Sequence, residues 1–69
     1  MYLVKIIFLN DNNKEQDIIN YSYPDEYTAN KIYNKLLNHY RQNRNNINNI
    51  KILLIENSKR ILKERHILK

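Results

Sequence analysis

The chain has 69 residues, with 12 basic and seven acidic side chains and a formal charge of +5, which fits one small basic domain. It contains no cysteine, glycine or tryptophan. The composition therefore excludes a disulfide framework, a thiolate metal site and the glycine-rich loops that bind nucleotide phosphates. A domain of about 60 residues buries only roughly 60% of its unfolded surface, so we expect self-association or a partner to add stability.

The first third of the chain contains two segments typical of β-strands. Residues 2–9 are β-branched and aromatic, and the run is too short for a typical helix. Residues 17–23 alternate, with Ile19, Tyr21 and Tyr23 on one side. The polar segment 10–16 predicts a turn in which asparagine or aspartate adopts the left-handed conformation that glycine usually supplies. We expect the two strands to form a hairpin.

An amphipathic helix is predicted after the hairpin. Ser22 is suited to cap the helix, Pro24 to occupy its first turn, and Asp25 to complement its positive end. The pattern ends near Arg44, where the asparagine-rich segment 43–49 predicts a loop. Apolar residues recur at helical spacing between these limits, namely Ala29, Ile32, Tyr33, Leu36, Leu37 and Tyr40.

Two further segments follow the helix. Residues 50–56 are apolar on both faces and predict a third strand, and Asn57 and Ser58 predict a tight turn. Residues 59–69 match neither the helical nor the strand period. We expect a fourth strand there, and a short C-terminal helix is the alternative.

The predicted fold is therefore ββαββ, an α+β domain spanning residues 1–69, with one antiparallel four-stranded sheet and one helix on one face. Segments 2–9 and 50–56 are apolar on both sides, so they belong in the centre. The mixed segments belong at the edges, which gives the strand order 2-1-3-4 with a helical crossover. A β-grasp-like order is the alternative, but it would place the polar last segment in the centre.

No combination of residues predicts catalysis. A general base needs an oriented partner, and His39, near Arg41 and Arg44, is the one candidate; we expect it on the solvated side of the helix. The carboxylates of segment 10–17 match no calcium loop, and the glycine of such a loop is absent. We expect a protein that is not an enzyme and that uses no metal or other cofactor.

Charge is distributed unevenly along the chain. Residues 1–40 hold four basic and five acidic side chains, whereas residues 41–69 hold eight basic and two acidic ones. We expect the end of the helix and the last two strands to share a basic region that attracts phosphates or an acidic protein surface. The candidate contact residues are Arg41, Arg44, Lys51, Lys59, Arg60, Lys63 and Arg65.

One helix covers only one face of a four-stranded sheet. The other face should expose enough apolar surface to require a second copy or a partner. The alternative is that the C-terminal segment folds back over it. The residues expected on this dimer or partner face are Leu3, Ile7, Leu9, Ile18, Leu53 and Ile55.

In size, element order and composition, the whole chain resembles the small accessory proteins of phages and mobile elements, anti-CRISPR proteins among them. Asparagine, isoleucine and lysine, whose codons are AT-rich, provide 13, 11 and eight residues. That group shares no sequence motif, so the resemblance rests on these general properties. It implies a non-enzymatic inhibitor of a host defence nucleoprotein complex of the CRISPR-Cas type, acting in the host cytoplasm through protein and basic-patch contacts.

The alternative function is a dimeric nucleic-acid-binding regulator that contacts the phosphate backbone through its basic C-terminal half. The expected partners are thus a host protein or nucleoprotein complex, or RNA or DNA. No membrane partner is expected, and we expect a homodimer or a partner-bound form.

Overall fold

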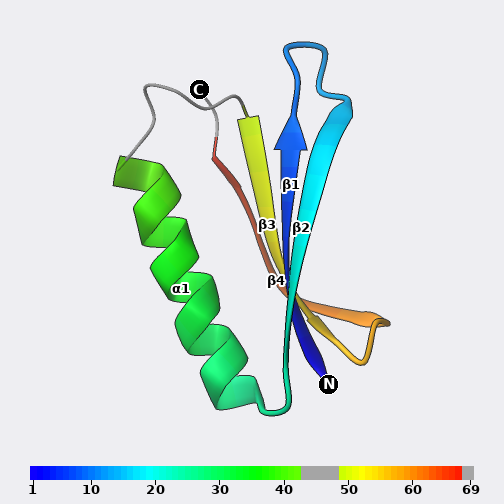
Figure 1. Cartoon of the computed structure of the whole chain (residues 1–69), viewed down its shortest axis with the longest axis vertical. Coiled ribbons are helices and arrows are strands. Elements are labelled where there is room, and N and C mark those ends of the chain that lie inside the picture. The colour runs from blue at the N-terminus through cyan, green and yellow to red at the C-terminus, as the bar shows by residue number, and fades with distance from the viewer. Residues whose placement is uncertain (43–48, 68–69) are drawn as a thin grey trace.

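The computed structural model describes residues 1–42 and 49–67. Its elements are β1 (Tyr2–Leu9), β2 (Glu15–Tyr23), α1 (Glu26–Gln42), β3 (Asn49–Glu56) and β4 (Arg60–Ile67). The strands form one antiparallel sheet in the order β2-β1-β3-β4, and α1 lies across one face (Figure 1). The predicted ββαββ fold and strand order are confirmed, and neither the β-grasp order nor the C-terminal helix forms. Most of the predicted asparagine-rich loop, with Arg44, lies outside the described residues.

Asparagine side chains build the turn between β1 and β2. The side-chain Oδ1 of Asn10 accepts hydrogen bonds from the backbone N–H groups of Asn12 (2.9 Å) and Lys14 (3.0 Å). Asn13 has a φ of 60°, the left-handed conformation that asparagine tolerates. This confirms that asparagine takes the role of glycine in the turn.

The helix begins one residue after its cap, Asp25. The Asp25 carboxylate accepts hydrogen bonds from the Thr28 backbone N–H (2.8 Å) and the Thr28 hydroxyl (3.0 Å). These bonds hold the pKa of Asp25 below its usual value, because they stabilise the carboxylate form. Ser22 was the expected cap, and this is wrong: Ser22 lies within β2, since the strand continues to Tyr23.

The core lies between α1 and the sheet. Alternate residues of β1 and β3 point towards the helix, and Ala29, Tyr33 and Leu37 face them from α1. The largest fully buried side chains are Val4, Ile6, Ile50, Ile52 and Leu54, all from the two central strands. Central strands are covered on both sides by neighbours, so their apolar residues are the most completely buried.

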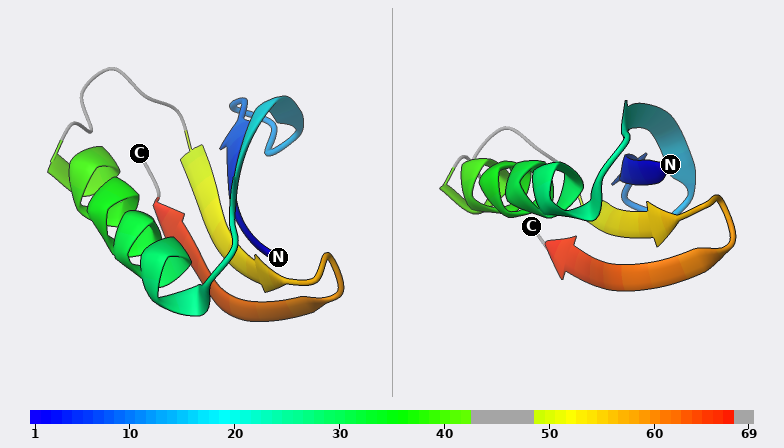
Figure 2. Two further views of the ribbon diagram at one scale, coloured as in Figure 1. Left: turned by 60° about the horizontal axis from the view of Figure 1, so that its bottom comes forward. Right: turned by 90° about the horizontal axis from the view of Figure 1, so that it is seen from below.

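A β-bulge interrupts β4 beside the β3–β4 turn. Ile61 pairs with Ile55 and Lys63 pairs with Leu54, so Leu62 is the extra residue. A regular strand continued back from Lys63 would place Ile61 on the helix side of the sheet and Leu62 on the other side. With the bulge, Leu62 packs against the core and Ile61 lies opposite Ile55 on the side away from α1. The bulge explains why residues 59–69 match no single period. The β3–β4 pair is also strongly bent (Figure 2).

The structure contains one helix in its described part, and α1 is not long and apolar enough to cross a membrane. Three of its 17 residues are buried, and charged or amide side chains occupy most of its exposed surface. The helix therefore serves as a one-sided cover for the sheet.

Candidate functional site

The candidate site lies where α1 borders the edge strand β4. Lys63 and Arg65 alternate with Glu64 along β4, so both basic residues point to the helix side of the sheet while Glu64 points to the other side. Arg41 lies in the last turn of α1. We call Arg41, Lys63 and Arg65 the basic strip; all three side chains are exposed.

Tyr33 is the aromatic residue around which the basic strip is arranged. The Nζ of Lys63 lies 5.8 Å from the centre of the Tyr33 ring, and it also donates a hydrogen bond to Asn30 Oδ1. Burial raises the pKa of the Tyr33 hydroxyl, while the positive charges of Arg65 and Arg41 oppose that rise. The charges of both arginines therefore act on the same buried phenol, and the two arginines lie on the same side of the molecule.

The basic strip has no acidic partner in the described part of the chain. The two ion pairs found there are Lys51–Glu64 and Arg60–Glu56, and neither involves Arg41, Lys63 or Arg65. An unpaired cation remains available to an anionic ligand, because no internal carboxylate has to be displaced first.

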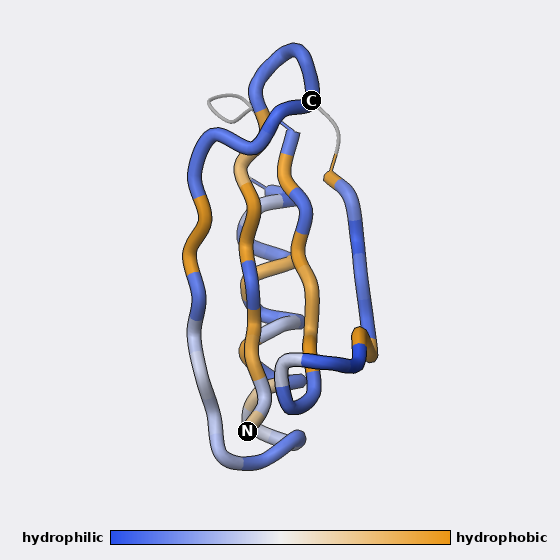
Figure 3. Tube along the Cα trace, turned by 90° about the vertical axis from the view of Figure 1, so that its right-hand side faces the viewer, coloured by the Kyte–Doolittle hydropathy of each residue, from blue (hydrophilic) through white to orange (hydrophobic). Residues whose placement is uncertain are grey.

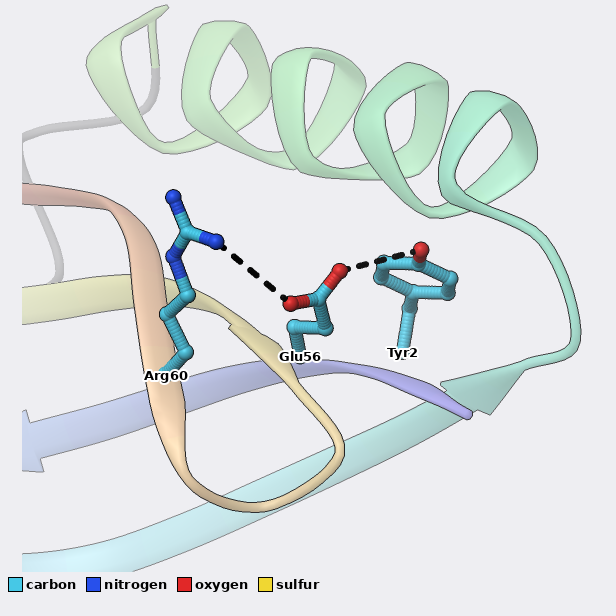
Figure 4. Close-up of polar contacts among 3 residues, drawn as sticks. All are labelled: Tyr2, Glu56 and Arg60. Atoms are coloured by element: carbon cyan, nitrogen blue, oxygen red, sulfur yellow. Dashed lines mark hydrogen bonds and ion pairs between the residues drawn. The ribbon is translucent and has the colours of Figure 1, made fainter.

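Arg60 differs from the basic strip because Glu56 neutralises it. Arg60 Nη1 lies 3.9 Å from Glu56 Oε1, and the Tyr2 hydroxyl donates to Glu56 Oε2 at 3.2 Å (Figure 4). The three residues lie side by side on the helix side of β1, β3 and β4. Burial and the neighbouring Glu56 raise the pKa of Tyr2, so its hydroxyl stays protonated, and a donor to the carboxylate, to a higher pH than that of an ordinary tyrosine.

The structure therefore divides the seven predicted contact residues. Arg41, Lys63 and Arg65 come together, and Arg60 lies on the same side but is paired. Lys51 lies on the opposite face of the sheet, where its Nζ is 3.7 Å from Glu64 Oε1. Lys59 lies in the β3–β4 turn, and Arg44 is outside the described residues.

The face of the sheet opposite α1, which we call the open face, has no element over it among the described residues (Figure 3). All six residues predicted for it point there, but they are not equally exposed. Ile7 and Leu53 are buried at 8% and 5% exposure, Leu3, Leu9 and Ile55 are half-buried, and Ile18 is exposed at 40%. The expectation of one broad exposed patch is therefore wrong for Ile7 and Leu53.

The register explains why these two residues are shielded. Leu53 lies in a row between Lys5 and Glu64, and Ile7 lies in the next row between Ile18 and Lys51. The aliphatic stems of such long side chains cover neighbouring apolar surface while their charges remain in water. Tyr21 lies opposite Val4 on the helix side of the sheet, as the sequence predicts, but it is 42% exposed because β2 is an edge strand.

A shallow hollow of about 500 Å³ lies at the end of the open face beside the β1–β2 turn. Its walls include Ile7, Leu9, Lys51 and His66, and the Asn49 amide donates to Asn13 Oδ1 (3.1 Å) at its rim. The lining lacks a hydrogen-bonded nucleophile and base. In residues 1–42 and 49–67, no three histidine or acidic side chains gather in a way that could hold a metal ion.

Asn30 and Tyr33 belong to the site but were not predicted as site residues. The sequence predicts both in the helix, with Tyr33 in the core, and no local pattern links either of them to Lys63, which lies at least 30 positions later in the chain. His39, the nearest candidate base, packs its ring edge-on against Tyr40 with centroids 5.1 Å apart. Tyr40 in turn contacts Phe8 edge-on at 6.0 Å.

Comparison with known proteins provides no relative for this chain. No family model matches it, and no curated protein or solved structure shows significant similarity to it.

Proposed function

We propose that this chain is a non-enzymatic binding protein that inhibits a host nucleoprotein complex of the CRISPR-Cas type, and that the basic strip is its contact site. The observation that carries the proposal is the gathering of Arg41, Lys63 and Arg65 on one edge without acidic partners in the described residues. Such a surface attracts the phosphates or acidic face of a nucleoprotein. The resemblance to small phage accessory proteins favours a host defence complex as the target.

The second candidate function is direct binding of nucleic acid as a dimeric regulator. The same strip favours it, because arginine and lysine beside an aromatic ring are typical contacts to a phosphate backbone. The strip includes no helix surface that enters a groove with a set of base-reading side chains. Such binding would be mainly independent of base sequence.

Fluorescence anisotropy with labelled single-stranded RNA and duplex DNA separates the two candidates. Three phosphate contacts on duplex DNA give a salt slope of about −2.7, so affinity should fall about 40-fold between about 50 and 200 mM salt. Lys63→Ala combined with Arg65→Ala leaves one contact and a fall of about 3.5-fold. Lys59→Ala combined with Arg60→Ala removes the same charge outside the strip and should keep the steep slope.

A plaque assay tests the inhibitor function. A phage that carries the gene should plate better on hosts with the defence system than the same phage lacking it, and Lys63→Ala with Arg65→Ala should remove the advantage. Equal plating with and without the gene, together with steep salt-dependent binding to free nucleic acid, would support the second candidate. Equal plating and no binding at about 50 mM salt would reject both.

A further inference from the structure

The outer edge of β2 is an unprotected strand edge. β2 has nine residues and pairs with β1 alone, so one side of it has no neighbouring strand among residues 1–42 and 49–67 (Figure 3). The unpaired N–H and C=O groups of such an edge are a template for another strand. From Ile18 to Tyr23, this edge has no charged residue, proline or bulge.

The opposite edge of the sheet is protected. β4 carries Arg60, Lys63 and Arg65 along its length and a bulge at Leu62. Basic side chains and bulges are the usual features that prevent strand pairing at an edge. The two edges of this sheet therefore differ in their capacity to accept a strand, and β2 is the one that accepts it.

One hydrogen bond identifies which residues of β2 direct their backbone outwards. The Ile18 N–H donates to its neighbour's carboxylate, Asp17 Oδ1, at 2.9 Å, so it does not donate to β1. Antiparallel strands direct alternate residues to alternate sides. Ile18, Asn20 and Ser22 therefore present their backbone groups to the free side.

We propose that β2 pairs antiparallel with β2 of a second copy of this chain, about a two-fold axis at Ile19. This register sets all nine residues of the strand against the second copy; the pairing is regular from Asp17 to Tyr21, and the bulge at Gln16 lies outside that stretch. It sets Ile18 opposite the partner's Asn20, both outward-facing, as a hydrogen-bonded pair requires. On pairing, the Ile18 N–H exchanges the Asp17 carboxylate for the carbonyl of the partner's Asn20. Asp17 then lies opposite the partner's Tyr21 and Glu15 opposite the partner's Tyr23, so no two carboxylates face each other.

Charge and burial also favour a second copy at this edge. Each chain carries +5, but β2 holds two acidic residues and no basic one, and the basic strip lies at the far edge of the sheet. Pairing at β2 thus keeps the two basic strips apart. It also covers Ile18 and Tyr21, which are 40% and 42% exposed in the monomer. Pairing of β2 with β4 would be open-ended and would not close into a dimer.

Sedimentation equilibrium on the full chain tests this proposal, which is independent of the proposed function. The wild type should reach twice the 8.5 kDa monomer mass as concentration rises to about 0.5 mM. Asn20→Lys places a charge at the free edge and should raise the dimer dissociation constant at least about tenfold. Asn34→Lys, on the exposed surface of α1, adds the same charge and should leave it unchanged.

Cysteine cross-linking tests the register, since the chain has no cysteine of its own. Directly opposed residues at a non-hydrogen-bonded position have Cα atoms about 4.5 Å apart, within disulfide reach. Ile19→Cys should therefore form a disulfide-linked dimer under mild oxidation, whereas Glu64→Cys on β4 should not. A monomer at about 0.5 mM, or a dimer that Asn20→Lys leaves equally tight, would overturn the proposal. A dimer that Ile19→Cys fails to link would overturn the register.

Discussion

Ile52 and Leu53 are adjacent in β3 and are both buried, but their side chains lie on opposite sides of the sheet. Ile52 is 0% exposed and lies beneath α1 in the core cluster. Leu53 is 5% exposed on the open face, where its neighbours in the row are Lys5 and Glu64 rather than another layer of the protein. Truncating these two side chains should therefore have unequal effects on stability.

Ile52→Ala should lower the free energy of unfolding by about 4 kcal/mol, because it removes three buried carbons and leaves a cavity that α1 closes. Leu53→Ala removes the same number of carbons, but water and the lysine stem fill the space. It loses only the transfer contribution, about 2 kcal/mol. A chain of this length is expected to have a total stability of about 3–10 kcal/mol, so Ile52→Val, at about 1 kcal/mol, serves as a milder second variant.

Urea denaturation followed by circular dichroism measures both effects. At an m value of about 1 kcal/mol/M, the midpoints of Ile52→Ala and Leu53→Ala should differ by about 2 M. The samples should be dilute, so that self-association does not add stability. Equal destabilisation by the two substitutions would refute the reasoning, because it would mean that the open face is enclosed as completely as the core.

Three further predictions concern local interactions. Asp25→Ala should lower the melting temperature, and the advantage of the wild type should shrink as the pH falls below about 3.8 and through the lowered pKa of Asp25; an advantage that is constant over this fall in pH would contradict the capping role. Ser58→Gly should raise stability by about 1 kcal/mol in a thermal melt, because Ser58 has a φ of 60°; a lower melting temperature would contradict this. Tyr33 stays protonated above the usual tyrosine pKa of 10, so its contribution to the free energy of unfolding is lost as the pH rises from 10 through the raised pKa of Tyr33. Arg65→Gln removes a positive charge and should raise the pKa of Tyr33 further in an NMR titration. A lower pKa of Tyr33 in this variant would show that Arg65 does not act on the phenol.

The elements and their order were predictable because each carries a local pattern. Ala29, Tyr33 and Leu37 recur at helical spacing, and the central strands carry apolar residues on both faces. Asn13, Asn57 and Ser58, all at positive φ, lie in the segments where a glycine-free chain has to turn. These features act over a few residues, so the sequence displays them directly.

The helix cap and the fourth strand were harder to predict for the same physical reason. Ser22 and Asp25 both suit a cap, and the choice between them depends on where pairing of β2 with β1 ends, at Tyr23 opposite Tyr2. The bulge at Leu62 depends on the bend of β3 and β4 around the core. Both outcomes follow from contacts between strands distant in sequence.

From the sequence, the candidate site could be predicted only as a basic segment of the chain, without the residues that form it. The excess of basic residues after position 40 is a property of the sequence, and so is the lack of a catalytic or metal-binding motif. Which of those residues are free is a property of the tertiary structure. Lys51 and Arg60 are paired because Glu64 and Glu56 lie beside them in the sheet, while the charges of Arg41 and Arg65 act on the Tyr33 phenol.

The sequence by itself determined the ββαββ order and the turns, because these arise from side-chain periodicity and local backbone preferences. Only the tertiary structure decided which cations form the basic strip, how far Ile7 and Leu53 are shielded, and which edge of the sheet is left unprotected. The reason is that charge pairing, burial and edge exposure are set by neighbours across strands, and the identity of those neighbours depends on register, twist and the position of α1.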